Sequence, residues 1–328
     1  MDVVIANADI TQVAADLIVM KHANGFRGAD EVVARTVSFT STVPAGEFAF
    51  HSGRGTAASE VLFIGVGPLR AFRYEQIQQF GQRAVALAAQ HRPASKHLVL
   101  TIHGPGYGLD LEEAFLSMVA GLIAELKSGQ HTIKTISIVD RSDKRCDELF
   151  AVLQKHAQQF GLVASTHRSF KLTGALDQSG HGQSNIVQFG SRAEAKPKLF
   201  VAMPFKSEFD DEFEIGFCEA ARASEYVCER LDVEHFTGDI VSEIKRRIIG
   251  SHGVVALLNE HNPNVFLEIG FAFANDKPTI LVAKEGVTLP FDVSGHRCIR
   301  YRSIVQLRDA LTKEITALKA SGVLVKRA

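Results

Sequence analysis

At 328 residues the chain is longer than one ordinary domain, and at about 150 residues per domain its length predicts two. A hydrophobic content of 46% and a charged content of 22% are those of a globular protein with ample core. The formal net charge of −1 supplies no overall positive field, which argues against nucleic acid or an anionic membrane surface as partner. A small phosphate-bearing ligand is not excluded, because small sites use local groups.

No targeting or metal-binding pattern is found in the sequence. Residues Met1–Ile5 lack the basic region and long apolar run of a signal peptide, and no apolar stretch approaches the roughly 20 residues that cross a bilayer. The cysteines are Cys146, Cys218, Cys228 and Cys298. Their wide spacing without a C-x-x-C pair indicates reduced thiols in a cytoplasmic protein, and we expect no metal and no cofactor.

Short β-rich apolar runs alternate with longer amphipathic stretches, which predicts an α/β fold. The strands expected in the first half are Val3–Ala6, Leu17–Met20, Val61–Val66, His97–Ile102 and Thr135–Val139. The helices expected between them are Gly28–Thr36, Arg73–Gln90, Leu111–Lys127 and Asp143–Phe160. This pattern predicts a first domain over residues 1–172.

A polar segment with little to bury follows, over residues 173–196. It contains Asp-Gln-Ser-Gly-His-Gly-Gln-Ser-Asn and then Ser-Arg-Ala-Glu-Ala-Lys. Such composition is typical of a linker. We therefore expect a second domain over residues 197–328.

The alternation restarts after the linker. The expected strands are Leu199–Met203, Tyr226–Glu229, Gly253–Leu258, Thr279–Ala283 and Cys298–Tyr301. The expected helices are Asp211–Ser224, Asp239–Ile249, Val265–Ala274 and Ile304–Ser321. Strands separated by helices favour a doubly wound parallel sheet, in which ligands bind beyond the carboxyl ends of the strands.

Glu268 is the unusual residue of this second domain. It lies in a predicted helix whose other members, over Val265–Ala274, are nearly all apolar. A helix that is apolar on all sides is buried, and an ionisable group within it needs a reason. One reason is a ligand; the other is a carboxylate favoured by the start of a helix.

Three stretches of the second domain resemble the nucleoside 2-deoxyribosyltransferase-like family, which is related to TIR-type NAD hydrolases. They are Lys198–Phe205, Gly238–Ile244 and Asn262–Ala272, the last with the most specific pattern, Asn-Pro-Asn-Val-x-x-Glu-x-Gly. The resemblance spans about Lys198 to Tyr301.

The resemblance implies that Glu268 acts on the anomeric carbon of a nucleoside. A second carboxylate, Asp239 or Glu243, would protonate the leaving base or orient the ribose hydroxyls. Substrate contacts are implied at the remaining motif positions, which are Met203, Pro204, Phe205, Asn262 and Asn264.

The first domain resembles a macro domain, the α/β fold that binds ADP-ribose. The residues that carry this resemblance are Ala8–Thr11 and the glycine loop within Thr101–Ala114. It implies an ADP-ribose-type ligand at Asp9, Ile10, Gly104, Gly106, Tyr107 and Gly108. The segment after the second strand, Met20–Asn24, departs from the macro pattern and is also similar to the N-terminal domains of leucine aminopeptidases, which need not bind ADP-ribose.

Together the two resemblances imply two three-layer α/β domains, a macro-like domain followed by a flavodoxin-like doubly wound parallel sheet. The preferred function is a nucleotide N-glycosidase, a hydrolase of NAD or of a nucleoside monophosphate, with a nucleotide-sensing first domain. The architecture suggests bacterial anti-phage (antiviral) defence by analogy alone. The alternatives are a non-catalytic nucleotide-binding module and a deoxyribosyltransferase of nucleoside salvage. The oligomeric state, including a homo-oligomer, stays open.

Overall fold

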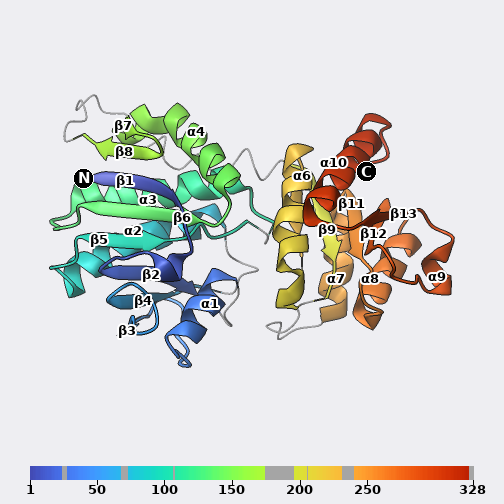
Figure 1. The fold of residues 1–328 in the computed structure, drawn as a ribbon, viewed down its shortest axis with the longest axis horizontal. Coiled ribbons are helices and arrows are strands. Elements are labelled where there is room, and N and C mark those ends of the chain that lie inside the picture. The colour runs from blue at the N-terminus through green and yellow to red at the C-terminus, as the bar shows by residue number, and fades with distance from the viewer. Residues whose placement is uncertain are drawn as a thin grey trace. The chain divides into compact units, whose positions relative to one another are not determined.

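The computed structural model describes residues 1–23, 28–67, 73–105, 108–173, 196–204, 206–230 and 240–324. It contains two compact units, one made of Met1–Gly104 with Asp110–Ser191 and the other of Pro105–Leu109 with Arg192–Ala328. Both are α/β (Figure 1). The predicted linker, residues 173–196, lies outside the described residues except at its two ends, so this boundary stays a prediction.

The first unit is built on a mixed sheet with the strand order β3-β4-β2-β5-β6-β1-β8-β7. Its strands are β1 (Asp2–Asn7), β2 (Leu17–His22), β3 (Phe48–Ser52), β4 (Glu60–Gly65), β5 (His97–Leu100), β6 (Thr135–Asp140), β7 (Leu162–Thr166) and β8 (Ser169–Leu172). The inner strands β4, β2, β5, β6 and β1 run parallel, while β3 and the β7–β8 hairpin are antiparallel additions at the two edges. All five predicted strands are confirmed, and they are the five parallel ones.

The helices of this unit follow the prediction closely. They are α1 (Ala29–Thr36), α2 (Tyr74–His91), α3 (Leu111–Ser128) and α4 (Asp143–Phe160), with a short 3-10 turn η1 (Ile10–Gln12) after β1. Apolar residues of α1 pack with those of β2 and β4 on one face of the sheet. The long helices α2 and α3 cross so closely that a glycine of each helix lies against the backbone of the other helix.

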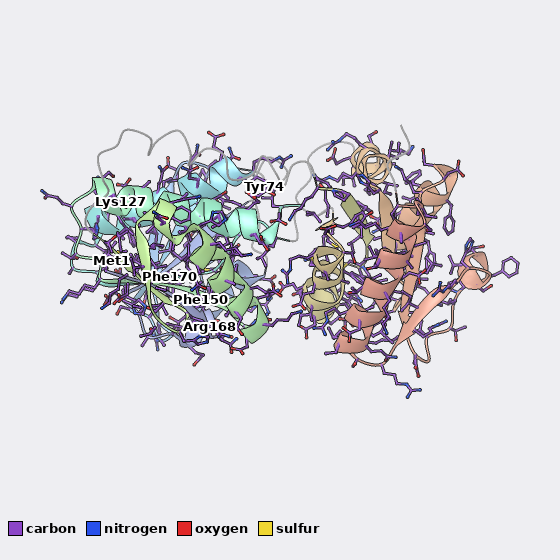
Figure 2. The ribbon with its side chains drawn as sticks, turned by 90° about the horizontal axis from the view of Figure 1, so that it is seen from above. Met1, Tyr74, Lys127, Phe150, Arg168 and Phe170 are labelled. Carbon is purple, nitrogen blue, oxygen red and sulfur yellow. The ribbon has the colours of Figure 1, made fainter. Side chains whose placement is uncertain are left out.

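The C-terminal hairpin of the first unit is tied to α4 by aromatic and charged contacts (Figure 2). Phe170 of β8 is fully buried against Phe150 of α4, with ring centroids 5.1 Å apart. Arg168, in the hairpin turn with a φ of 56°, bonds to Asp143 at 2.7 Å and Asp147 at 2.6 Å. These contacts explain why the short and mostly exposed strand β7 is ordered.

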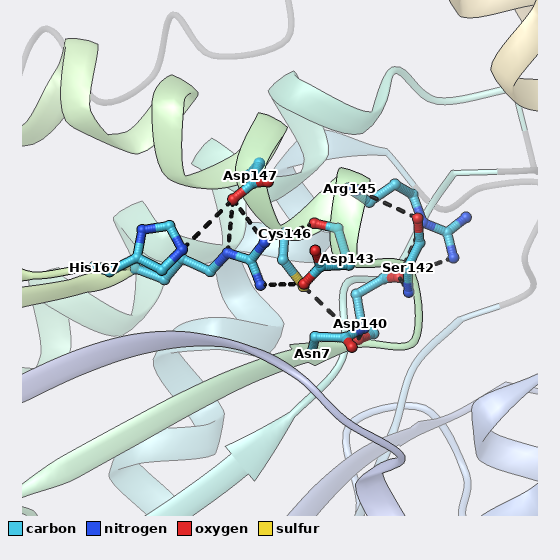
Figure 3. Close-up of polar contacts among 9 residues, drawn as sticks. Asn7, Asp140, Ser142, Asp143, Arg145, Cys146, Asp147 and His167 are labelled. Atoms are coloured by element: carbon cyan, nitrogen blue, oxygen red, sulfur yellow. Dashed lines mark hydrogen bonds and ion pairs between the residues drawn. The ribbon is translucent and has the colours of Figure 1, made fainter.

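A second polar cluster joins the ends of β1 and β6 to the start of α4 (Figure 3). Asp140 accepts hydrogen bonds from the Ser142 backbone N–H at 2.7 Å and from Arg145 Nε at 3.0 Å. Asn7 donates to the Asp140 carbonyl at 3.1 Å. Because these polar groups satisfy one another, we interpret the cluster as structural.

The second unit is a five-stranded parallel sheet with the order β10-β9-β11-β12-β13. Its strands are β9 (Lys198–Ala202), β10 (Val227–Glu229), β11 (Gly253–Leu257), β12 (Thr279–Lys284) and β13 (Cys298–Tyr301). In the order in which the strands follow along the chain this is 2-1-3-4-5, the flavodoxin-like arrangement. The predicted doubly wound parallel sheet is confirmed.

Helices cover both faces of this sheet, which makes three layers (Figure 1). They are the 3-10 turn η4 (Ser207–Phe209), the π-helix η5 (Glu212–Cys218), α6 (Glu219–Ala223), α7 (Ile240–Gly250), α8 (Pro263–Ala274), α9 (Phe291–Ser294) and α10 (Ile304–Ala320). One core contains α7 and α8, and the other contains η5, α6 and α10. The helix expected over Asp211–Ser224 begins with a π-helical stretch, a geometry that is rare and frequent at functional sites.

Within the described ranges, no helix is both long and apolar enough to cross a bilayer.

Two helical glycines lead to opposite stability predictions. A Cβ on Gly121 of α3 would lie 1.9 Å from the Gln78 carbonyl oxygen of α2, whereas one on Gly270 of α8 would meet nothing within 4 Å. Gly121→Ala should therefore destabilise by about 1–3 kcal/mol or more through overpacking. Gly270→Ala should stabilise by about 0.4–1 kcal/mol, because only the helix propensity changes.

Urea unfolding of the full-length protein, followed through methyl NMR signals of each unit, measures both effects. The two variants are controls for each other, because the chemical change is the same. A Gly121→Ala variant as stable as the wild type would contradict the close crossing of α2 and α3. A destabilising Gly270→Ala would contradict the open surroundings of that position. Gly270 lies on the exposed side of α8.

Candidate functional site

The candidate site of the second unit lies where its strands end. In a parallel sheet of this order, ligands bind beyond the carboxyl ends of the strands, beside the point where the strand order reverses. Here that point lies between β9 and β11, which are neighbours in the sheet. Met203 and Pro204 follow β9 and are buried, and Phe205 lies outside the described residues. The loop after β11 leads from Asn259 into α8.

Local sequence explains where α8 begins. The Asn262 side chain caps the helix by accepting a hydrogen bond from the Asn264 backbone N–H at 3.0 Å. Pro263 occupies the first helical position, where its missing N–H costs no hydrogen bond. The two asparagines predicted to bind substrate therefore form the helix cap, Asn262 through its side chain and Asn264 through its backbone. Whether either side chain also contacts a substrate stays a prediction.

Glu268 lies on the buried face of α8. It shares this face with Val265, Ile269 and Ala272, while Leu267 is 45% exposed. Helical side chains lean toward the N-terminus of their helix, so the Glu268 carboxyl group extends toward the carboxyl edge of the sheet. Only 4% of Glu268 is exposed. Neither a hydrogen bond nor an ion pair to its carboxyl group comes from any described residue.

Burial changes the protonation of this group. It raises the pKa of Glu268 to about 8, because a charged carboxylate loses its hydration in apolar surroundings. The dipole of α8 favours the charged form, but that effect is only about 0.3–1 kcal/mol and the desolvation is larger. In the absence of a ligand, most molecules therefore carry a neutral Glu268 at pH 7.

Of the two candidates for the second carboxylate, Glu243 of α7 is described and Asp239 lies outside the described residues. Glu243 accepts hydrogen bonds from Arg246 Nε at 2.8 Å and Arg247 Nε at 2.8 Å. The bonds from Arg246, with those from Arg247, lower the pKa of Glu243 to about 2. A group that is ionised at neutral pH is not a proton donor there, and a role of Glu243 in orienting hydroxyl groups stays a prediction.

A network that the sequence did not indicate lies at the same edge of the sheet. We call it the Tyr301 network; its members are Glu212, Asn259, Lys284 and Tyr301. They come from the start of η5 and from the ends of β11, β12 and β13. The one available signal was Glu212, an acidic residue next to apolar Phe213, although many solvated helix positions give the same signal.

In the first unit, Asp9 and Ile10 lie just after β1. Asp9 accepts hydrogen bonds from the Thr11 hydroxyl at 2.7 Å and the Thr11 backbone N–H at 2.9 Å. The side-chain bond from Thr11, with the backbone bond and the charge of Arg141, holds the pKa of Asp9 below its ordinary value. Asp9 is therefore an ionised acceptor at neutral pH, and Ile10 is buried beside it.

The described part of the glycine loop includes Gly104 and Gly108, whose φ angles of 112° and 79° favour glycine. Gly106 and Tyr107 lie outside the described residues. The start of α3 is capped by Asp110, which accepts from the backbone N–H groups of Glu112 and Glu113 at 3.1 Å each. Two N–H groups that a diphosphate would use at this helix end are thus already bonded.

The sequence also did not indicate a buried charged pair in the first unit. Lys21 of β2 forms an ion pair with Asp30 of α1, and both side chains are about 95% shielded from solvent. Burial raises the pKa of Asp30 although Lys21 opposes it, and burial also keeps the pKa of the nearby His103 well below its ordinary value. Asp30 Oδ1 and His103 Nε2 have no hydrogen-bond partner among the described residues.

No group of three or more His, Cys, Asp or Glu side chains in the described ranges is arranged to hold a metal ion.

Comparison with known proteins gives a distant likeness for part of the chain. No protein-family model and no curated protein matches it. Solved macrodomains do match, among them the Oceanobacillus iheyensis macrodomain with ADP (16% identity over 47% of this chain and 91% of that chain, TM-score 0.39). Another is the Trypanosoma brucei macrodomain in complex with ADP-ribose (17% identity over 47% of this chain and 68% of that chain, TM-score 0.39). The structures similar to this chain thus include macrodomains; the likeness of the second unit to deoxyribosyltransferases stays a prediction.

Proposed function

We propose that the second unit is a nucleotide N-glycosidase in which Glu268 acts at the anomeric carbon. The observation that carries the proposal is a buried carboxyl group without a partner among the described residues, on the first helix after the central strand of a flavodoxin-like sheet. A buried ionisable group that is neither paired nor needed for packing is a candidate functional group. Breaking an N-glycosidic bond develops positive charge on the ribose, which such a group stabilises once it is ionised.

The protonation state that Glu268 adopts with a ligand bound distinguishes NAD from a nucleoside monophosphate as substrate. Ionising an unpaired buried carboxyl group is costly unless the ligand supplies a compensating charge. The nicotinamide ring of NAD carries a positive charge at its bond to the ribose, so its binding would favour the ionised form. A nucleoside monophosphate lacks this charge, and its neutral base leaves more readily when it is protonated, which a neutral Glu268 would support.

The test is incubation of purified full-length protein with NAD, nucleoside monophosphates and deoxynucleosides, with the released base measured by chromatography across pH 5–9. NAD cleavage by ionised Glu268 should rise with pH up to about 8, whereas base loss assisted by neutral Glu268 should fall above that pH. Transfer of the sugar to a second added base would indicate a transferase. No release from any substrate would favour the non-catalytic alternative.

We further propose that the first unit binds an ADP-ribose-type nucleotide through Asp9 and the start of the glycine loop at Gly104, and senses it for the second unit. Support comes from the ionised Asp9 acceptor at the end of β1 and from the positive φ angle of Gly104. If the first unit is a sensor, adding ADP-ribose should change the rate of base release. A role in anti-phage defence rests on this pairing of activities and stays a hypothesis.

Asp9→Asn provides a specific test of the adenine contact that the macro-domain resemblance implies. The amide oxygen still accepts from Thr11, but the amide N–H₂ replaces the oxygen that would accept from the adenine amino group. We expect ADP-ribose to bind about tenfold to a hundredfold more weakly, since a hydrogen bond to a charged group is worth about 1.5–3 kcal/mol. The affinity for the hypoxanthine analogue, which lacks that amino group, should fall much less. Calorimetry in which both ligands bind as tightly as to the wild type would contradict the contact.

A further inference from the structure

Three consecutive residues between β11 and α8, Asn259, Glu260 and His261, each contact a different part of the unit. Asn259 donates from Nδ2 to the Tyr301 hydroxyl at 2.6 Å and accepts from the Lys284 backbone N–H at 2.8 Å. Glu260 pairs with Lys206, which follows β9. His261 Nε2 lies 3.0 Å from the Thr288 carbonyl oxygen, after β12. A loop anchored this closely presents α8 in one position.

Tyr301 connects this loop to Glu212, a buried carboxyl group of the same unit. Its side chain is fully buried, and its hydroxyl donates to Glu212 Oε1 at 3.0 Å. Glu212 is 2% exposed and also forms an ion pair with Lys284 Nζ at 2.9 Å. The Lys284 backbone N–H donates to Asn259, so hydrogen bonds and one ion pair close the Tyr301 network into a ring. Buried polar groups that are mutually satisfied in this way rigidify their surroundings.

Asn259 and Glu268 are joined by a short piece of chain, the anchored loop and the first turns of α8. Because the Glu268 side chain leans toward the N-terminus of α8, its carboxyl group follows the position of that helix end. A catalytic carboxyl group must stay within about 0.5 Å of its working position, and a displacement of about 1 Å can cost about a hundredfold in rate. The loop fixes the N-terminal end of α8, in addition to the packing of its buried face in the core.

We propose that Tyr301 is a positioning residue for Glu268 and acts through Asn259. For its effect on turnover this inference rests on the proposed N-glycosidase function; for its effect on Glu268 itself it does not. Tyr301→Phe removes only the hydroxyl oxygen and leaves the ring in place. The Asn259 amide then loses its acceptor within the protein and turns toward water, the loop loosens, and water gains access to Glu268.

The experiment is a pH titration of full-length wild type and Tyr301→Phe, with the glutamate side-chain carboxyl groups labelled with ¹³C and followed by NMR. The resonance assigned to Glu268 is the one that Glu268→Gln removes. We expect its pKa to fall toward the ordinary value in Tyr301→Phe. For base release, kcat should drop about tenfold to a hundredfold, with KM little changed because ground-state binding is kept.

Tyr226→Phe is the matched control. Tyr226 is also buried in the second unit, and its hydroxyl donates to the Leu324 carbonyl oxygen at 3.1 Å, far from the loop in sequence. It should lose stability as Tyr301→Phe does but keep the wild-type titration of Glu268 and wild-type turnover. Asn259→Ala tests the route: adding Tyr301→Phe to it should change the Glu268 titration no further.

An unchanged Glu268 titration in Tyr301→Phe, with stability lowered as in the control, would show that Tyr301 is structural and overturn the proposal. Additive effects of Tyr301→Phe and Asn259→Ala would overturn the route through Asn259. If the wild type releases no base from any nucleotide, the proposed function fails, and the titration still decides the positioning role.

Discussion

Glu268→Gln should lower the rate of base release at least about a hundredfold, which corresponds to about 3 kcal/mol of lost transition-state stabilisation. Glutamine keeps the shape of the side chain and leaves no cavity, but it can neither carry the negative charge nor give up a proton as an acid. Nucleotide binding in the ground state should survive, because the interaction is specific to the transition state. Single-turnover kinetics with NAD, together with calorimetric binding to the variant, separate the two effects.

The same substitution should make the second unit more stable at alkaline pH. Unfolded Glu268 has an ordinary pKa of 4.5, whereas burial raises the pKa of the folded group to about 8. Between these values the unfolded chain releases a proton that the folded chain keeps, so wild-type stability falls as pH rises from 4.5 to about 8. Each pKa unit corresponds to about 1.4 kcal/mol, so the loss is of the order of several kcal/mol.

Glu268→Gln removes this dependence, so urea unfolding of the second unit should show a variant near wild type at pH 5 and clearly more stable at pH 9. Glu219→Gln is the control, since Glu219 is equally buried but paired with Arg308 at 3.4 Å. It should lose stability and keep turnover. Base release by Glu268→Gln at the wild-type rate would refute the catalytic assignment. If Glu268→Gln is no more stable than the wild type at pH 9, the raised pKa of Glu268 is refuted.

Lys21→Met should destabilise the first unit by about 3–5 kcal/mol, because it leaves the buried Asp30 without its cation. Asp30 would respond by keeping its proton, which moves its already raised pKa further up. The unfolded chain releases that proton above about the ordinary value of 3.8, so the loss should be smallest near pH 4 and grow toward pH 8. Urea unfolding followed through methyl signals of the first unit measures it.

The double variant Lys21→Met, Asp30→Leu is the control for this prediction. Removing both charges leaves no unpaired ion, and replacing a buried pair by apolar residues is often neutral or stabilising. We therefore expect it to recover most of the stability and to lose the pH dependence. If Lys21→Met alone leaves the stability of the first unit unchanged, the Lys21–Asp30 pair does not stabilise the fold as its burial implies. If the double variant is as unstable as the single one, packing and not charge is responsible.

The positions of the parallel strands and of most helices could be predicted from sequence, because burial on both faces makes each parallel strand a nearly continuous apolar run. The runs Val61–Ile64 and Gly253–Leu258 show this directly. The edge strands β3, β7 and β8 could not, since they are half exposed and owe their order to pairing with β4 and β1 and to contacts such as Phe150 with Phe170. The π-helical start at Glu212 likewise has no local signal in the sequence.

For the candidate site, the sequence alone identified Glu268, because an acidic residue in an apolar helix is conspicuous whatever the fold. Its protonation was decided only by tertiary structure, since the pKa depends on which groups surround the carboxyl. The pairing of Glu243 with two arginines and the ring that joins Asn259, Tyr301 and Glu212 were also decided there. Tyr301 and Glu212 are 89 residues apart, and a hydrogen bond over such a separation has no periodicity from which a sequence could predict it.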